Sequence, residues 1–177
     1  MSQLTDRMIQ AAKLDVNVYE EVEGDETAMG QAMTVVIIAS LAAGIGTIST
    51  AGIGGLVLGT IGALIGWLVW AYLTYYIGTR ILPEPQTKSS PAELLRTTGF
   101  SSAPGVVRIL GVIPGLSAIV FFVAGIWMLV AMIIAVRQAL DYQSTLRAVG
   151  VCLIGFIVQA VVLAVVFSIF GTPRGVM

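Results

Sequence analysis

Residues 27–79 read TAMGQAMTVVIIASLAAGIGTISTAGIGGLVLGTIGALIGWLVWAYLTYYIGT and contain no Asp, Glu, Lys or Arg. As one helix rising about 1.5 Å per residue they would extend roughly 80 Å, whereas the hydrocarbon core of a bilayer is about 30 Å thick. The stretch therefore predicts two membrane crossings, over residues 28–48 and 53–79. Glycines in the turn between them, residues 44–55, allow the backbone angles of a tight reversal.

The composition of the whole chain predicts an all-α membrane protein. Further uncharged runs cover residues 109–136 and 148–173, and each is long enough to cross a bilayer as a helix. Hydrophobic residues make up 57% of the 177 residues and charged residues 11%, far from the composition of soluble domains. We expect a polytopic transmembrane helical bundle over residues 28–171, with residues 172–177 as a short tail.

The same composition restricts the chemistry that the chain can perform. It has no histidine, which excludes histidine-based acid–base catalysis and histidine ligation of a metal or haem. The sequence contains no phosphate-binding loop, nucleophile elbow, metal cluster or paired-carboxylate motif. A net charge of −1 argues against a nucleic-acid partner. We therefore expect no enzymatic activity, catalytic residue, cofactor or metal, and we expect bound membrane lipids.

The positions of the basic residues predict the topology. Basic residues collect on the cytoplasmic side of membrane proteins, which places residues 80–96 and 137–147 in two cytoplasmic loops. The chain must cross an even number of times between these loops, so we expect spans at residues 99–113 and 115–136, followed by a last span at 148–170. This arrangement gives five crossings of the plasma membrane, with the N-terminus in the cytoplasm and the C-terminus on the far side. Because residues 99–113 are few for a full crossing, four crossings with a half-embedded third segment are the alternative.

Residues 1–27 form a separate polar segment before the first span. Within it, residues 3–14 fit a short interfacial helix with one apolar face, made by Leu4, Met8, Ala11 and Ala12. An acidic stretch follows, which we expect either to stay in solvent or to dock onto protein. The candidates for docking are Asp15, Tyr19, Glu20 and Glu23.

Small residues spaced four apart indicate helix-packing surfaces, because helices in lipid associate through close packing. The second span has two such rows, and the span at residues 115–136 continues into a third. The first row is Gly55, Gly59 and Ala63; the second is Gly62 and Gly66; the third is Ala131, Ala135 and Ala139. These rows pack either within the bundle or against another subunit.

Two polar residues lie deepest in the predicted spans, Arg108 and Gln159. A charge at such a depth is costly, so it faces protein or water and has a partner. Arg108 can extend to the surface, pair with a carboxylate such as Asp141, or hold a lipid phosphate. Gln159 is placed to hydrogen-bond a neighbouring helix. Near the second charged loop, Arg137 and Asp141 can pair on one helix face and form a structural corner with Arg147.

Several segments resemble the bacterial branch of the Yip family, the Ypt/Rab-interacting membrane proteins. The acidic segment with Tyr19, Glu20 and Glu23 precedes GQAMTVVIIASLAAG, and the second span ends in YLTYYIGTRIL. ELLRTTGFSSAPGVVRILGVIPGL, the span with Trp127, and AVRQALDYQSTLRAV follow. The resemblance implies a five-helix membrane bundle with a cytoplasmic N-terminus. Eukaryotic members contact Rab GTPases through longer N-terminal regions with an Asp-Leu-Tyr-Gly-Pro type motif, which this chain lacks, so a Rab partner is not expected.

Two functions fit these observations. The first is a non-enzymatic scaffold or accessory subunit that packs against other integral membrane proteins or against itself, for example in a complex of respiratory or photosynthetic type. The second is a small transporter or lipid-handling protein with a polar cavity around Arg108 and Gln159.

Overall fold

The structure is a computed structural model that describes residues 3–170, and every regular element in this part of the chain is helical. This confirms the all-α fold class. In chain order the elements are α1 (Gln3–Ala12), α2 (Val16–Gly24), the 3₁₀ turn η1 (Glu26–Ala28), α3 (Met29–Gly46), α4 (Ile48–Tyr76), the π-helical turn η2 (Ile77–Ile81), α5 (Pro91–Phe100), the 3₁₀ helix η3 (Ala103–Val112), α6 (Ser117–Ala139) and α7 (Thr145–Phe170).

Four helices in the described residues are long and apolar enough to cross a membrane. They cover Glu26–Gly46, Ile48–Ile81, Ser117–Ala139 and Thr145–Val162. The first two form the predicted hairpin, whose reversal extends from Thr47 to Gly52. Inside α4, Gly52 has φ 64° and ψ −172°, a conformation that favours glycine, and it kinks the helix near the hairpin.

The segment between α4 and α6 is helical but is not one regular helix. Helix α5 begins with a capping box between Ser90 and Glu93, and η3 follows with Pro104 in its first turn. A 3₁₀ helix rises about 2.0 Å per residue, so the 10 residues of α5 and the 10 of η3 together extend roughly 35 Å. This length includes residues 91–96, which belong to the predicted cytoplasmic loop, as well as the predicted span at residues 99–113. The total of five crossings stays a prediction.

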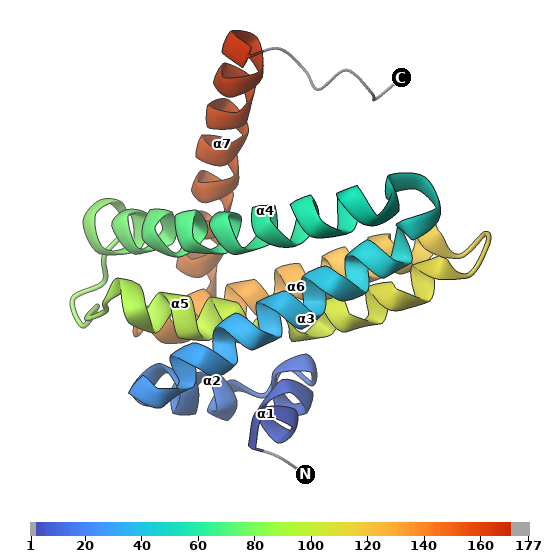
Figure 1. Ribbon diagram of the computed structural model, residues 1–177. Coiled ribbons are helices and arrows are strands. Elements are labelled where there is room, and N and C mark those ends of the chain that lie inside the picture. The colour runs from blue at the N-terminus through green and yellow to red at the C-terminus, as the bar shows by residue number, and fades with distance from the viewer. Residues whose placement is uncertain (1–2, 171–177) are drawn as a thin grey trace.

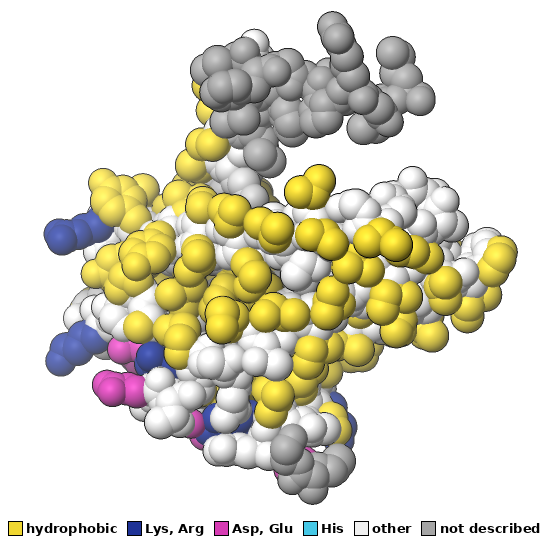
Figure 2. All heavy atoms as spheres, in the orientation of Figure 1, with side chains coloured by type: hydrophobic (Ala, Val, Ile, Leu, Met, Phe, Trp, Pro, Cys, Tyr) yellow, Lys and Arg dark blue, Asp and Glu magenta, His cyan; other side chains and the backbone are white. Residues whose placement is uncertain are grey.

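The long helices alternate in direction along the bundle. In Figure 1, α4 lies above α3, while the α5–η3 segment and α6 lie beside α3. The α3–α4 and η3–α6 turns lie at one end, and the α4–α5 and α6–α7 loops lie at the other, which we call the charged end. Helix α7 stands across the direction of the other long helices. Hydrophobic side chains cover the face over α4, and charged side chains gather at the charged end and near α1 and α2 (Figure 2).

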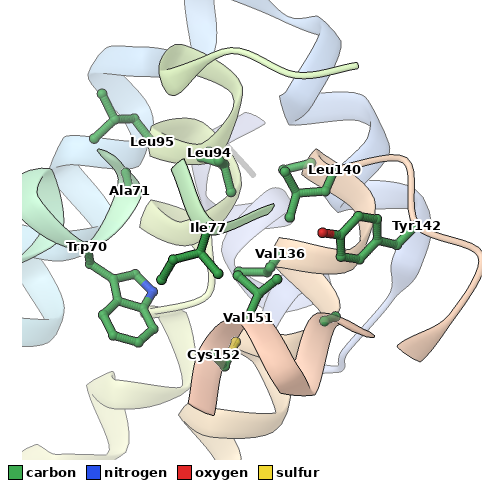
Figure 3. Close-up of a cluster of buried hydrophobic side chains, with 12 residues drawn as sticks. Trp70, Ala71, Ile77, Leu94, Leu95, Val136, Leu140, Tyr142, Val151 and Cys152 are labelled. Atoms are coloured by element: carbon green, nitrogen blue, oxygen red, sulfur yellow. The ribbon is translucent and has the colours of Figure 1, made fainter. Parts of the chain in front are cut away.

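A cluster of buried side chains closes the charged end. Figure 3 shows Ile77, Leu94, Val136 and Val151, which come from η2, α5, α6 and α7 and converge on one another. The ring of Trp70 joins this cluster and is 4.6 Å from the ring of Phe156, measured between centroids. The first turns of α7 are therefore fixed to the bundle, since α4, η2 and α6 all contact them.

Candidate functional site

A hollow beneath α4, which we call the central hollow, brings together the two polar residues that the sequence places deepest. It has a volume of about 280 Å³ and is bounded by α3, α4, α5, η3, α6 and α7. Arg108 of η3 and Gln159 of α7 both line it. Its other lining residues are Val36, Ala39, Ser40, Ala63, Gly66, Trp67, Trp70, Thr98, Ser102, Met128, Met132 and Phe156.

The backbone of η3 positions Arg108 through close packing against α3. A Cβ atom added to Gly46 would collide with the carbonyl oxygen of Arg108, so only glycine lets the two backbones approach this closely. A Cβ atom added to Gly105 would lie 2.7 Å from the Arg108 guanidinium and 2.9 Å from the sulfur of Met128. Two glycines on two elements therefore make the space in which the Arg108 side chain lies.

The Arg108 guanidinium is only partly satisfied by protein groups. Its Nε donates to the Gly105 carbonyl at 3.1 Å, and Nη2 donates to the Ala39 carbonyl at 3.2 Å. A guanidinium has five N–H groups, and within the described residues the others have no acceptor. No buried side-chain nitrogen or oxygen in this part of the chain lacks a partner, so Nη1, which makes no hydrogen bond, is accessible from open space.

One of the three alternatives for Arg108, pairing with Asp141, is not formed. Asp141 lies in the α6–α7 loop at the charged end with φ 54°, whereas Arg108 lies along the bundle between α3 and α6. The three ion pairs found in the described residues join Arg7 to Glu21 and Asp25, and Arg147 to Glu84. Arg108 is therefore a cation without a carboxylate partner in the described part of the chain.

Two further hollows adjoin the central hollow. The α3–α4 hollow, of about 210 Å³, shares Ser40, Ala63 and Arg108 with it. The α4–α7 groove, of about 430 Å³, shares Gly66 and Gln159 with it. Its remaining lining is apolar and consists of Gly62, Ile65, Val69, Leu73, Val158 and Val162. Space thus extends along α4 on both sides of the Arg108 region.

The three small-residue rows have two kinds of surroundings: the row of α6 is packed within the chain, and the two rows of α4 border open space. Ala131, Ala135 and Ala139 of α6 are completely buried within the chain. The rows of α4 instead border space: Gly55, Gly59 and Ala63 line the α3–α4 hollow, and Gly62 and Gly66 line the α4–α7 groove. A Cβ atom added to Gly59, Gly62 or Gly66 would meet no other atom within 4 Å. These glycines do not bring α4 into close contact with another helix of the chain.

The predicted corner at the charged end is held by contacts other than an Arg137–Asp141 pair. Helix α6 ends at Ala139, so Asp141 does not continue the helix face that carries Arg137. Arg137 instead donates to the carbonyls of Tyr142 and Gln143 at 3.2 and 3.3 Å. Arg147 lies 3.4 Å from Glu84 in an ion pair and donates to the Pro83 carbonyl.

Glu84 and Tyr142 join the two loops of this corner. The Glu84 carboxylate accepts hydrogen bonds from the backbone N–H groups of Gln143 and Ser144, and these bonds lower its pKa. The Tyr142 hydroxyl lies 3.0 Å from the Gly78 carbonyl and 2.7 Å from the Leu82 carbonyl. The two charged loops therefore lie at the same end of the bundle, as the grouping of basic residues predicts.

The N-terminal segment docks onto its own chain. Tyr19 is 0% exposed, and its hydroxyl donates to the Ala11 carbonyl at 3.1 Å. Asp15 caps the start of α2, and Glu20 accepts a hydrogen bond from Gln138 of α6. The apolar face of α1 packs on α2 and the α5–η3 segment, so protein covers it.

A charged network that the sequence did not reveal fixes this segment. Arg7 is 4% exposed and bonds to Glu21, Asp25 and Gln31. Arg96 of α5 donates to the carbonyls of Val22 and Glu23 at the end of α2, where the helix dipole favours a cation. Arg7 lies on the same helix face as Ala11, four residues later, and Arg96 follows the buried pair Leu94 and Leu95; these are the signals that could have indicated the two roles.

The model of the Yip1 domain family matches residues 17–167. The chain belongs to this family. The match confirms the resemblance, and together with the four apolar helices it identifies a Yip1-family membrane protein. No curated protein and no solved structure shows significant similarity to the chain.

The Yip1 match covers every residue that lines the central hollow. It begins within α2 and extends into α7, so it also includes Tyr19, Glu20 and Glu23. In the described residues, no group of three or more Cys, Asp or Glu side chains is arranged to hold a metal ion. The residues of the central hollow are suited to binding a ligand, since Arg108, Ser102 and Gln159 supply hydrogen-bond donors.

Proposed function

We propose that this Yip1-family protein is a non-enzymatic, lipid-handling membrane protein whose central hollow binds an amphiphile. The observation that carries the proposal is that Arg108 and Gln159, from η3 and α7, line one hollow. Polar residues inside a membrane are costly and usually serve a pathway or a ligand when they face a cavity. Here they face a hollow that adjoins the apolar α4–α7 groove at Gly66 and Gln159, which supports a lipid in preference to a small ion.

The experiment that tests this proposal measures lipid retention by the purified full-length protein. Native mass spectrometry of protein from lipid nanodiscs should detect a lipid bound in a fixed ratio. Replacing Arg108 by Gln should reduce that bound fraction, because the substitution removes the charge and most of the donors. Arg80→Gln is the matched control, since Arg80 is an exposed cation outside the hollows. If wild-type protein retains no lipid beyond the annular background, the proposal is wrong.

Protein abundance separates a lipid role from a structural role. If Arg108 binds lipid, Arg108→Gln should reduce retention without lowering the amount of protein in the membrane. A loss of abundance alone would instead indicate that Arg108 stabilises the fold through the Gly105 and Ala39 carbonyls.

A second candidate function is a scaffold or accessory subunit that packs against another integral membrane protein or a second copy. The observation that favours it is the exposed side of α4, where glycines make no close contact within the chain. Close approach of small residues is a common means of helix association in lipid. A cysteine at Val57, which is 48% exposed, should crosslink to a partner in native membranes. A lone monomer in mild detergent with no co-purifying protein would count against this role.

We also propose that the N-terminus and the charged end face the cytoplasm of a prokaryotic plasma membrane, which the positive-inside rule supports. A cysteine at Ser117, at the opposite end of the bundle, should react only with a reagent applied from outside. The native Cys152 is buried and provides a low background. Labelling of Ser117→Cys by a reagent confined to the cytoplasm would overturn the five-crossing arrangement.

A further inference from the structure

We infer that the ligand of the central hollow is an anionic lipid, with its phosphate on Arg108 and an acyl chain in the α4–α7 groove. This inference rests on the proposed lipid-handling function and names the class of lipid.

The charge around the hollow favours an anion. Arg108 is the one charged side chain that lines the central hollow, the α3–α4 hollow or the α4–α7 groove in the described residues. A cation removed from water needs an anionic partner or well-placed acceptors, and the two carbonyls at Gly105 and Ala39 supply only part of them. A phosphate provides the missing charge and can accept two parallel N–H bonds from a guanidinium.

Two neighbouring polar side chains have donors available for the same ligand. The Ser102 hydroxyl and the Gln159 amide line the central hollow, and within the described residues neither makes a hydrogen bond. By contrast, the hydroxyls of Ser40 and Thr98 bond to carbonyls of their own helices. Arg108, Ser102 and Gln159 therefore present donors from three parts of the chain to one space without a carboxylate.

The shape of the adjoining space selects a lipid over a free phosphate ion. The α4–α7 groove begins at Gly66 and Gln159, which also line the central hollow, and continues between apolar side chains such as Val158 and Val162. Because a Cβ atom at Gly62 or Gly66 would meet nothing, these glycines leave room beside α4 for an alkyl chain. A headgroup at Arg108 thus has an apolar groove beside it, on the other side of Gly66 and Gln159, that can take its acyl chain.

The test compares lipids with defined headgroups on the full-length protein. Nanodiscs that contain equal amounts of phosphatidylglycerol and phosphatidylcholine should yield protein with phosphatidylglycerol retained preferentially. Arg108→Gln should reduce that preference roughly tenfold or more, as expected for the loss of charged hydrogen bonds. Arg108→Lys should keep part of the preference, because it keeps the charge without the fork of donors. Arg80→Gln should leave the preference unchanged.

A second variant tests the acyl-chain path and does not touch the arginine. Gly66→Leu should reduce retention of both lipids, because the side chain fills the junction between the central hollow and the groove. Gly30→Leu is the matched control, since a Cβ atom there also meets nothing within 4 Å but Gly30 lines none of these hollows. Thermal unfolding of all variants shows whether each one is folded.

The outcomes distinguish this inference from the proposed function. Equal retention of the two lipids by wild-type protein would overturn the anionic headgroup but keep lipid handling. Absence of any retained lipid would overturn both. Displacement of phosphatidylglycerol by millimolar inorganic phosphate, with no effect of Gly66→Leu, would identify a free phosphate site and overturn the lipid assignment.

Discussion

The charged end and the middle of the bundle are built from the same residue types but are packed in opposite ways. At the charged end, Gly99 lies against Ala32 and a Cβ atom added to it would be 2.7 Å from the Ala32 Cβ. Along the middle of α4, a Cβ atom added to Gly62 would meet nothing. The arginines at the two places differ in a similar way. Arg96 is 6% exposed and donates to carbonyls at the end of α2, whereas Arg108 has unused donors in the central hollow.

This difference separates residues that hold the fold from residues available to a ligand. Where a glycine packs against another helix, or an arginine donates to protein acceptors, its substitution should destabilise the chain. Where such residues border space, substitution should leave stability nearly unchanged and alter binding.

Replacement of Arg96 by Ala should lower the free energy of unfolding by about 3 kcal/mol, because it leaves the carbonyls at the end of α2 without their donor. The N-terminal helices should then detach and expose Arg7, which is buried in the intact protein. Trypsin cleavage after Arg7, followed by mass spectrometry, measures this detachment. Arg80→Ala, at an exposed cation, should leave both the stability and the cleavage rate unchanged. Protection of Arg7 in the Arg96→Ala variant would show that α2 is held by other contacts.

Replacement of Gly99 by Ala should lower the free energy of unfolding by about 1–3 kcal/mol, because the added methyl group overpacks the α3–α5 contact. The matched variant, Gly62→Ala, should change it by less than about 1 kcal/mol and in the stabilising direction, since helix propensity improves and nothing is displaced. Thermal unfolding in the same detergent compares the two variants. Equal destabilisation of the two variants would contradict the open space beside Gly62.

Much of the fold follows from the sequence, because lipid imposes simple requirements on length and polarity. The uncharged stretch at residues 27–79 forms the α3–α4 hairpin, and the two basic loops lie at one end of the bundle. The form of the α5–η3 segment was not predictable from hydropathy. Its reach depends on a long 3₁₀ helix, whose backbone packs closely against Gly46 of α3.

The residues of the candidate site were predictable, and a cavity shared by Arg108 and Gln159 was one of two alternatives, but the sequence could not decide between these alternatives. Arg108 and Gln159 are conspicuous because each interrupts an apolar run. Spacing along one helix could not show that η3 and α7 bring them to one hollow, and it could not show that the α4 glycines border space. A glycine row predicts that close contact is possible; whether a helix occupies the space depends on the tertiary structure.

Replacement of Tyr142 by Phe should lower the free energy of unfolding by about 1 kcal/mol, the usual net value of one buried hydrogen bond. The ring stays in the core at the charged end, while the carbonyls of Gly78 and Leu82 lose the hydroxyl. Amide hydrogen exchange of residues 78–82 should increase in this variant and remain unchanged in residues 55–66. Faster exchange in both regions would contradict the separation between the two parts of the bundle.

The smallest expected effect is a pH dependence of the contact between α2 and the charged end. Burial raises the pKa of Glu23 from 4.5 to about 8, and nearby carboxylates add to the shift. These are Asp141, Glu93 and Glu20, with Arg96 opposing them. The Asp25 carboxylate does not contribute in this range, since its bonds to Thr27 and Arg7 lower its pKa to about 2.

The direction of this effect follows from proton binding. Between pH 4.5 and about 8 the folded protein holds a proton on Glu23 that the unfolded chain has lost, so stability falls as the pH rises through this window. The effect is moderate because solvent reaches the partly exposed carboxylate. Trypsin cleavage after Arg7 should accordingly be slower at pH 6 than at pH 8.5, after correction for the protease's own pH dependence with a peptide substrate. Glu23→Gln should abolish the difference, and a difference that persists in this variant would assign the titration to another group.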